Sequence, residues 1–122
     1  MSALLTLPEA IDAITDAFDE GDGWDRYAWV YIRGEITDSA CRLYLSHVAD
    51  EDDALIDDNG EALPPFAAQH HLRHFLEAGD FAEVLFVQRR HKSDSGLADF
   101  IRALDHYHRH DSFLGMRPDA SL

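Results

Sequence analysis

Carboxylates dominate one short segment, VADEDDALIDDNGE at positions 48–61, which holds seven acidic residues and no Lys or Arg. Such a cluster can bind Ca²⁺, keep a loop solvated, mark a disordered segment, or attract a basic protein. A calcium loop fits poorly, because with Asp50 at its first position Ala54 and Leu55 fall where an oxygen ligand and an obligatory glycine belong. Leu55 and Ile56 interrupt the acidic run, so we expect apolar contacts to anchor the loop to the protein.

Histidines form a second group with potential chemistry, in the segments HHLRH and HYHRH. If the first segment is helical, His70 and His74 lie four residues apart on one polar face, the spacing that two metal ligands need. No HExxH glutamate or CxxC pair accompanies them, so a solvated helix face is favoured. A metal- or ligand-binding module built on His70 and His74, with His71 as a further candidate, is the alternative. In the second segment, His108 falls in an apolar helical stripe, and we expect it to be a hydrogen-bonded core residue.

Nucleophilic and cofactor chemistry lacks the motifs that it needs. The sequence contains no GxSxG, no GxxxxGK phosphate loop and no GxGxxG. Cys41, the single cysteine, sits in an apolar run without a partner for a disulfide or a cysteine-based zinc site, and we interpret it as a core residue. Carboxylates are too numerous for any one pair to stand out as a general acid and base. We therefore predict that the protein is not an enzyme and binds neither a metal nor a cofactor.

Charge is unevenly distributed along the chain. Residues 1–61 carry 16 acidic and 3 basic side chains and residues 62–122 carry 8 and 7, for a net charge of −14. A field of this sign repels nucleic acids and anionic membranes and attracts basic proteins over a long range. The start of the chain lacks the pattern of a secretion signal, and no apolar run reaches the roughly 18 residues of a membrane span. We therefore predict a cytoplasmic protein with a basic protein partner and no direct contact with nucleic acid or membrane.

An amphipathic helix in TLPEAIDAITDAFDEG positions the next group of acidic residues. Thr6 followed by Glu9 predicts a capping box, Pro8 suits the first turn, and Gly21 can end the helix. The outer face of this helix is wholly acidic. It holds Glu9, Asp12, Asp16, Asp19 and Glu20. Like charges four residues apart cost about 0.2 to 0.5 kcal/mol each, so a helix selected only for stability would carry Lys or Arg here.

The rest of the chain predicts strands followed by helices. RYAWVYIRG and ACRLYLSHV are rich in aromatic and β-branched residues and indicate two neighbouring strands, the first apolar on both faces and therefore covered on both sides. We interpret LPPFAAQHHLRHFLEAG as one or two short helices that Gly79 ends. Residues 81–91 suit a helix or a buried strand, and a cap formed by Asp80 and Glu83 favours the helix. An apolar stripe predicts a last helix over residues 97–110.

These elements define an α+β fold in a single domain, residues 1–122, with an amphipathic N-terminal helix, a small antiparallel sheet, a helical C-terminal half and a loosely held tail at 115–122. The predicted core contains apolar residues from the inner faces of these elements. They are Ile11, Ile14, Phe18, Trp29, Val30, Ile32, Leu43, Leu45, Leu72, Phe75, Leu97, Ile101 and Leu104.

We predict that the acidic loop, part of the helix face and the turn GDGWD form one docking surface for a basic protein. Opposed charge would steer the encounter, and an apolar residue such as Trp24 or Leu55 would anchor the complex. The predicted surface comprises Asp16, Asp19, Glu20, Asp22, Trp24, Asp25, Asp50, Glu51, Asp52, Asp53, Leu55, Asp57, Asp58 and Glu61.

Three segments resemble the small acidic immunity proteins of bacterial toxin–immunity systems, in particular those of contact-dependent growth inhibition: AWVYIR, PPFAAQHHLRHFLEAGDFAEV and ALDHYHRHDSFL. The last is similar to a Tyr-x-x-x-Asp-x-Phe ending, here Tyr107, Asp111 and Phe113, and the resemblance spans most of residues 6–114. It implies an inhibitor that binds one cognate basic toxin domain, commonly a nuclease that cleaves RNA, tRNA or DNA, and blocks its active site or substrate-binding surface. A DNA mimic that occupies a DNA-binding protein would use the same charge and is a further alternative.

Overall fold

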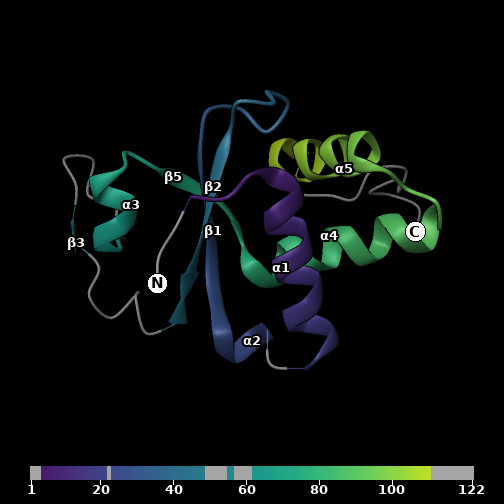
Figure 1. Ribbon diagram of the computed structural model, residues 1–122, viewed down its shortest axis with the longest axis horizontal. Helices are drawn as coiled ribbons and strands as arrows, with labels where there is room; N and C mark the ends of the chain where they lie inside the picture. Colours follow the sequence, from purple (N-terminus) through teal and green to yellow (C-terminus); the bar gives the residue numbers. More distant parts are fainter. Residues whose placement is uncertain (1–3, 22, 49–54, 57–61, 111–122) are drawn as a thin grey trace.

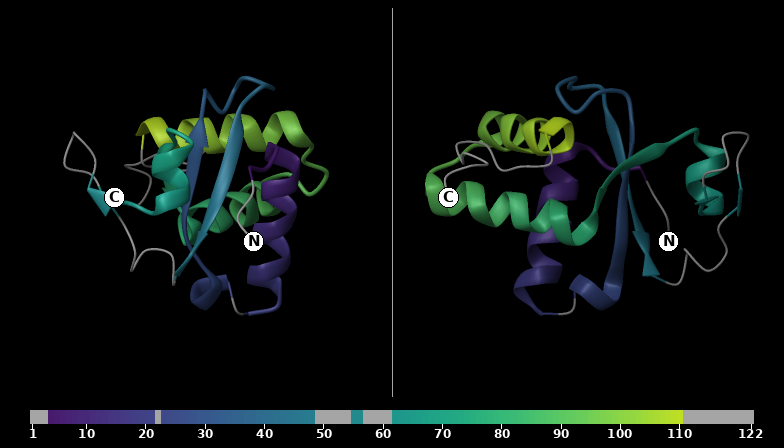
Figure 2. Two further views of the ribbon diagram at one scale, coloured as in Figure 1. Left: turned by 60° about the vertical axis from the view of Figure 1, so that its left-hand side comes forward. Right: turned by 180° about the vertical axis from the view of Figure 1, so that it is seen from behind.

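The computed structural model describes residues 4–21, 23–48, 55–56 and 62–110. The helices and strands are α1 (Leu7–Asp19), α2 (Gly23–Arg26), β1 (Tyr27–Arg33), β2 (Arg42–His47), β3 (Leu55–Ile56), β4 (Ala62–Leu63), α3 (Pro65–Gln69), β5 (Arg73–Glu77), α4 (Ala78–His91) and α5 (Leu97–His110). A three-stranded antiparallel sheet carries α1, α4 and α5 on one face and α3 with the β3–β4 pair on the other (Figure 1). The views in Figure 2 show the same division. The chain forms one small α+β domain with a helical C-terminal half, which confirms the predicted fold class.

The central strand β1 is covered on both faces, as its sequence predicts. The strand order is β2–β1–β5, and β1 pairs in antiparallel fashion with both neighbours. Val30 and Ile32 pack into the larger core with α1, α4 and α5, whereas Tyr31 packs with Tyr44 and Leu72 on the side of α3. Because successive side chains in a strand point to opposite faces, one apolar strand serves two cores.

Strand β5 occupies a segment for which the sequence predicted a helix. Only Pro65–Gln69 is helical there, and Arg73–Glu77 is a strand paired with β1. His71 has a backbone φ of 56°, a left-handed conformation that separates α3 from the strand. Gly79 ends no helix, because it lies in the first turn of α4. Tertiary pairing with β1 outweighs the local helical pattern, because strand formation depends strongly on what the strand packs against.

The two long C-terminal helices have nearly the predicted extents. Residues 81–91 are helical, as the sequence favoured, but α4 begins at Ala78. Its N-cap residue, Glu77, makes no side-chain capping hydrogen bond, so the predicted cap of Asp80 with Glu83 is wrong. The α5 helix has the predicted bounds, 97–110. No helix in the described part of the chain combines the length and apolar character needed to cross a membrane.

The predicted core is confirmed except at its margins. Cys41 is buried with the helix-side core, as predicted, and Phe18, Trp29 and Ile101 are half-buried. Leu97 is wrong as a core residue: its side chain is 44% exposed because it stands at the first position of α5, on the wall of an open cavity. His108 is also wrong as a core residue, because it is exposed near the end of α5 with its ring against Phe75, the centroids 4.7 Å apart. The remaining predicted core residues, Ile11, Ile14, Val30, Ile32, Leu43, Leu45, Leu72, Phe75 and Leu104, are buried.

Polar contacts fix the helices to one another. The mostly buried carboxylate of Asp99 accepts the Gly96 backbone N–H at 2.9 Å and forms ion pairs with Lys92 at 3.1 Å and Arg102 at 2.7 Å. The Gly96 bond and the two cations hold the pKa of this carboxyl below its usual range. These contacts fasten the turn between α4 and α5 to the first turn of α5.

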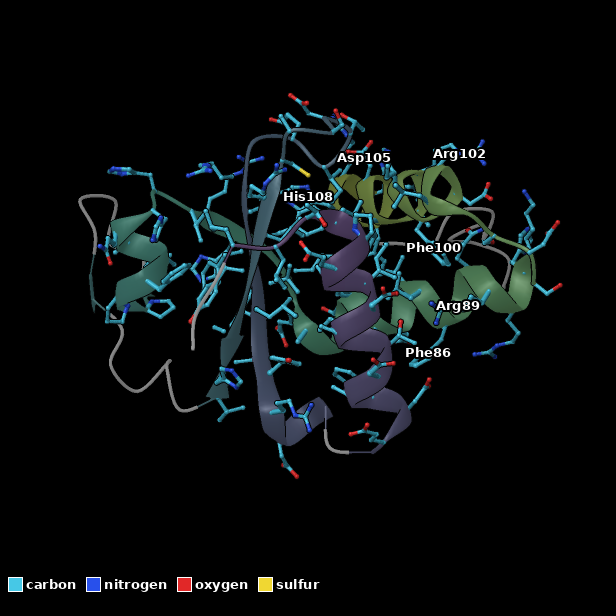
Figure 3. The ribbon with its side chains drawn as sticks, viewed as in Figure 1. Phe86, Arg89, Phe100, Arg102, Asp105 and His108 are labelled. Atoms are coloured by element: carbon cyan, nitrogen blue, oxygen red, sulfur yellow. The ribbon has the colours of Figure 1, made fainter. Side chains whose placement is uncertain are left out.

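Arg89 connects three helices. In Figure 3 it extends from α4 toward Phe100 of α5, and its guanidinium lies 5.2 Å from the centre of the Phe100 ring. The same guanidinium donates to the Thr15 hydroxyl of α1 at 3.2 Å. A cation over an aromatic face is stabilised by the quadrupole of the ring, so this contact favours one relative placement of α1, α4 and α5.

Candidate functional site

Local sequence fixes the position of α1. The Glu9 carboxylate accepts the Thr6 backbone N–H and the Thr6 hydroxyl, both at 2.9 Å, while the Glu9 backbone N–H donates to Thr6 Oγ1 at 3.4 Å. This is the predicted capping box, with Pro8 in the first turn as expected. The Thr6 bonds hold the pKa of Glu9 below its usual range. Gly21, at a φ of 90°, follows the C-terminal end of the helix as predicted.

Every charged side chain on the exposed side of α1 is a carboxylate. Its inner face buries Leu7, Ala10, Ile11, Ile14 and Ala17, so the helix is held rigidly against the core. We define the α1 acidic face as the exposed residues Glu9, Asp12, Asp16, Asp19 and Glu20. At 1.5 Å per residue this face is about 16 Å long. The last turn of α1 contains no basic residue.

Among the described residues, two Arg side chains act on the ends of the α1 acidic face and leave its middle without a basic partner. At the amino end, the capping hydrogen bonds and, after them, the charge of Arg42 lower the pKa of Glu9. Arg26 lies 3.8 Å from Glu20, a long and solvent-exposed ion pair that contributes little to stability. Arg89 reaches α1 but donates to the hydroxyl of Thr15. The negative potential of this face therefore extends into solvent.

The corner between α1 and α2 adds a further acidic residue to the same region. α2 packs against α1, and Asp25 is exposed within α2. Gly23 is buried so closely against the Phe18 ring that a Cβ at this position would overlap the ring. The glycine therefore allows α2 to lie against the C-terminal end of α1. Asp16, Asp19, Glu20 and Asp25, four members of the predicted docking surface, are thus brought together and exposed.

The other described member of the predicted surface is anchored elsewhere. Leu55 belongs to β3, which pairs with β4, and Leu63 of β4 is buried with Tyr31 and Tyr44 on the α3 side of the sheet. Figure 1 shows β3 on that side, with α1 on the opposite side. The central sheet therefore separates the backbone of Leu55 from the α1 acidic face. Outside the described residues, or with an undescribed side chain, are Asp22, Trp24, Asp50, Glu51, Asp52, Asp53, Asp57, Asp58 and Glu61.

The histidines considered as metal ligands do not share a helix face. His70 caps the C-terminal end of α3, and His74 lies in β5. The His74 ring is 4.7 Å from the rings of both Trp29 and Tyr31, and the His70 ring is 4.3 Å from Phe66. Within the described ranges, no three His, Cys, Asp or Glu side chains are grouped as a metal site would require. His70 and His74 therefore belong to a layer of aromatic side chains on the α3 side of the sheet. This layer was not predicted from the sequence, although it is formed by the aromatic residues Trp29, Tyr31 and Phe66 of the neighbouring segments.

The described residues line a pair of cavities on the helix side of the sheet that could accept a ligand. One, of about 410 Å³, lies between the β1–β2 connection, β5 and the end of α5. Its charged residues are paired: Arg73 lies 3.5 Å from Glu35, and Arg109 lies 2.9 Å from Asp105. Mutual neutralisation leaves this cavity little charge with which to select a ligand.

The second cavity, of about 370 Å³, lies at the amino end of α1 and is largely apolar. We call it the α1 cavity. The β1–β2 connection and the start of α5 form its other walls. The described residues that line it are Thr6, Leu7, Pro8, Ile36, Thr37, Asp38, Ser39, Cys41, Leu97 and Ile101. Neither cavity was predicted from the sequence, because each is formed by segments far apart in the chain.

Fold and charge together define a small acidic α+β domain with an amphipathic helix whose exposed charged residues are all acidic. The chain belongs to the DUF7716 family, a domain of unknown function whose model matches residues 4–116. Comparison with curated proteins and with solved structures finds no match in either set. The family description names no activity or partner, so the resemblance to immunity proteins stays a prediction.

Proposed function

We propose that the protein binds a basic protein domain through the α1 acidic face and thereby inhibits it. In its most specific form, the proposal is a cytoplasmic immunity protein that neutralises a cognate toxin, a nuclease whose substrate-binding surface is basic. It acts by binding and not by catalysis. The observation that carries the proposal is a rigid helix whose exposed face holds Glu9, Asp12, Asp16, Asp19 and Glu20 without an interleaved base.

This arrangement is unfavourable for the isolated protein. Asp16 has carboxylates four residues away on both sides, at Asp12 and Glu20, and each like-charge pair destabilises a helix. Asp19 and Glu20 also place negative charge at the negative end of the helix dipole. A surface that costs stability and remains exposed is best explained by an interaction in which the charge is neutralised.

A nuclease is a suitable partner because its substrate is a polyanion. The cleft that binds phosphates is basic, and a rigid row of carboxylates can occupy it in place of the nucleic acid. Charge complementarity of this kind raises association rates above the neutral range of about 10⁵ to 10⁶ M⁻¹s⁻¹ and makes them fall as salt is added. Fast capture suits an inhibitor that must act before the toxin reaches its substrate.

The test measures binding and protection, and its probe is the basic toxin domain that the immunity proposal expects the gene immediately upstream to encode. Two variants test separately whether the carboxylates of α1 or those of the acidic loop are needed for binding. The helix variant is Asp12→Asn/Asp16→Asn/Asp19→Asn/Glu20→Gln, and the loop variant is Asp52→Asn/Asp53→Asn/Asp57→Asn/Asp58→Asn. The matched control alters the net charge equally at another site and is Glu77→Gln/Asp80→Asn/Glu83→Gln/Asp94→Asn.

We expect the helix variant to keep its thermal transition, to bind the domain at least tenfold more slowly at low salt, and to protect cells less well than the control. Loss in the loop variant alone would move the docking surface from α1 to the acidic segment at residues 48–61. If the parent protein neither binds the upstream domain nor protects cells that express it, or if the upstream gene encodes no basic toxin domain, the immunity proposal is refuted. Binding to a DNA-binding protein without a toxin would support a DNA mimic.

A further inference from the structure

The α1 cavity leaves an apolar side chain exposed beside the acidic face. Leu97 is 44% exposed although it belongs to the apolar stripe of α5, and Ile101 one turn later is only half-buried. Both line the α1 cavity, whose floor includes the buried residues Ile36 and Cys41. Apolar area left in contact with water costs roughly 25 cal/mol per Å², so covering these walls would release free energy. A volume of about 370 Å³ lies in the range of sites that bind a ligand or receive a side chain.

The α1 cavity is continuous with the α1 acidic face. Pro8 lines the cavity, and Asp12, one turn further along α1, stands on the same side of the helix. Figures 1 and 2 both show the amino end of α1 close to α5 and to the β1–β2 connection. An apolar socket and a row of carboxylates therefore follow one another along one rigid helix.

The rim of the α1 cavity is also acidic. Asp38 lines it, and its side chain is held in place by accepting the Ala40 backbone N–H at 2.9 Å. No Lys or Arg is among the described residues that line the cavity. Arg42, which follows Cys41 in sequence, donates from its guanidinium to the Cys41 carbonyl oxygen at 2.8 Å and keeps its positive charge, which acts on Glu9 and on Cys41. The carboxylates of Asp38 on the rim and of Glu9 and Asp12 on the first turns of α1 outnumber this base, so the net charge around the opening favours a cationic occupant over an anionic one.

We infer that the α1 cavity receives one large apolar side chain of the basic partner, flanked by Lys or Arg residues that pair with Asp38 and Asp12. The inference rests on the proposed function and adds an anchor to it. Charge alone speeds association, whereas an apolar side chain buried in a pocket slows dissociation and dominates affinity. The partner segment would thus supply an apolar side chain for the α1 cavity and basic side chains for the carboxylates beside it.

The first experiment uses short capped peptides as probes for the whole ¹⁵N-labelled protein. Lys-Lys-Phe-Lys-Lys is compared with Lys-Lys-Ala-Lys-Lys and with Glu-Glu-Phe-Glu-Glu in an NMR titration. We expect the first peptide to bind about tenfold or more tightly than the second, because it buries the Phe ring, and to shift amide signals around Thr37, Cys41 and Leu97. Equal affinity for the first two peptides, or shifts confined to other surfaces, would overturn the inference.

The second experiment blocks the cavity at an exposed position. Thr37→Trp places a large ring at the opening, whereas Gln69→Trp adds the same ring to an exposed site on α3, on the opposite side of the sheet. We expect Thr37→Trp to abolish the preference for the Phe peptide and to speed dissociation of the toxin domain at least tenfold, while Gln69→Trp changes neither. If Thr37→Trp binds the toxin domain like the parent while the helix variant does not, this inference fails and the proposed function stands. If both bind like the parent, the proposed docking face is wrong.

Discussion

Removing carboxylates from α1 should stabilise the protein, and the double variant Asp16→Asn/Asp19→Asn tests this directly. Asp16 forms like-charge pairs with Asp12 and Glu20 at a spacing of four residues and with Asp19 at a spacing of three. At about 0.2 to 0.5 kcal/mol each, the loss of these pairs raises the free energy of unfolding by about 0.6 to 1.5 kcal/mol. Removing a negative charge from the last helical turn at Asp19 adds about 0.3 to 1 kcal/mol. Asn and Asp have similar helix propensities, so the substitution isolates the charge.

Urea unfolding, monitored by circular dichroism, measures the free energy of unfolding of the parent and of the double variant. At low salt we expect a gain of about 0.9 to 2.5 kcal/mol, which should largely disappear near 1 M NaCl, where the Debye length is about 3 Å. Glu83→Gln removes one exposed carboxylate from the middle of α4 and is the control, with an expected change within about 0.5 kcal/mol. A double variant less stable than the parent would show that these carboxylates make stabilising contacts, and the case for a surface maintained at a cost in stability would be lost.

Three further predictions concern the supports of the fold. Gly23→Ala should lower the free energy of unfolding by about 1 to 3 kcal/mol in chemical denaturation, because the new methyl group overlaps Phe18; an unchanged midpoint would contradict the close packing. Ser46→Ala should cost about 1 to 3 kcal/mol in the same assay, because the Ser46 hydroxyl, fully buried, accepts the Trp29 backbone N–H at 3.2 Å beside the β-bulge. Asp99 has a lowered folded-state pKa, so its contribution is complete above the pKa of the unfolded chain and is lost as pH falls from about 5. Asp99→Asn should therefore flatten the pH dependence of the thermal midpoint in that range, and equally steep profiles would argue against the ionised network.

The elements predicted correctly are those whose signals are local. The bounds of α1 follow from Thr6, Glu9 and Gly21, which satisfy the orphan backbone groups at the helix ends, and from an apolar stripe that only a helix can bury. β1 was predicted as a strand covered on both sides because Val30 and Tyr31 point to opposite faces and both are apolar. In each case the information lies within a single segment.

The errors arise where distant segments decide the structure. The segment 73–77 has a helical pattern, yet it becomes β5 because β1 offers an open edge that pairs with it. Leu97 has the periodicity of a core residue, but whether it is covered depends on how closely α1 and the β1–β2 connection approach α5. His70 and His74 were paired on the assumption of one helix, and the turn at His71 separates them. Periodicity reports the face on which a residue lies, and the fold decides whether anything covers that face.

The same distinction applies to the acidic residues. Summed along the sequence, residues 1–61 present one negative field, but the described part of the fold divides their anchors between two faces of the sheet: α1 on one, β3 on the other. Packed layers of this kind are about 10 Å apart, while the Debye length at physiological salt is about 8 Å. Charges that lie more than a Debye length apart therefore add at low salt, when a partner is attracted from a distance, and act separately at physiological salt, when it docks. Association at low salt should respond to both acidic regions, and affinity at physiological salt to the one in contact. A partner bound through α1 would leave the face that carries α3 free, so we expect affinity at physiological salt to depend on the carboxylates of the helix.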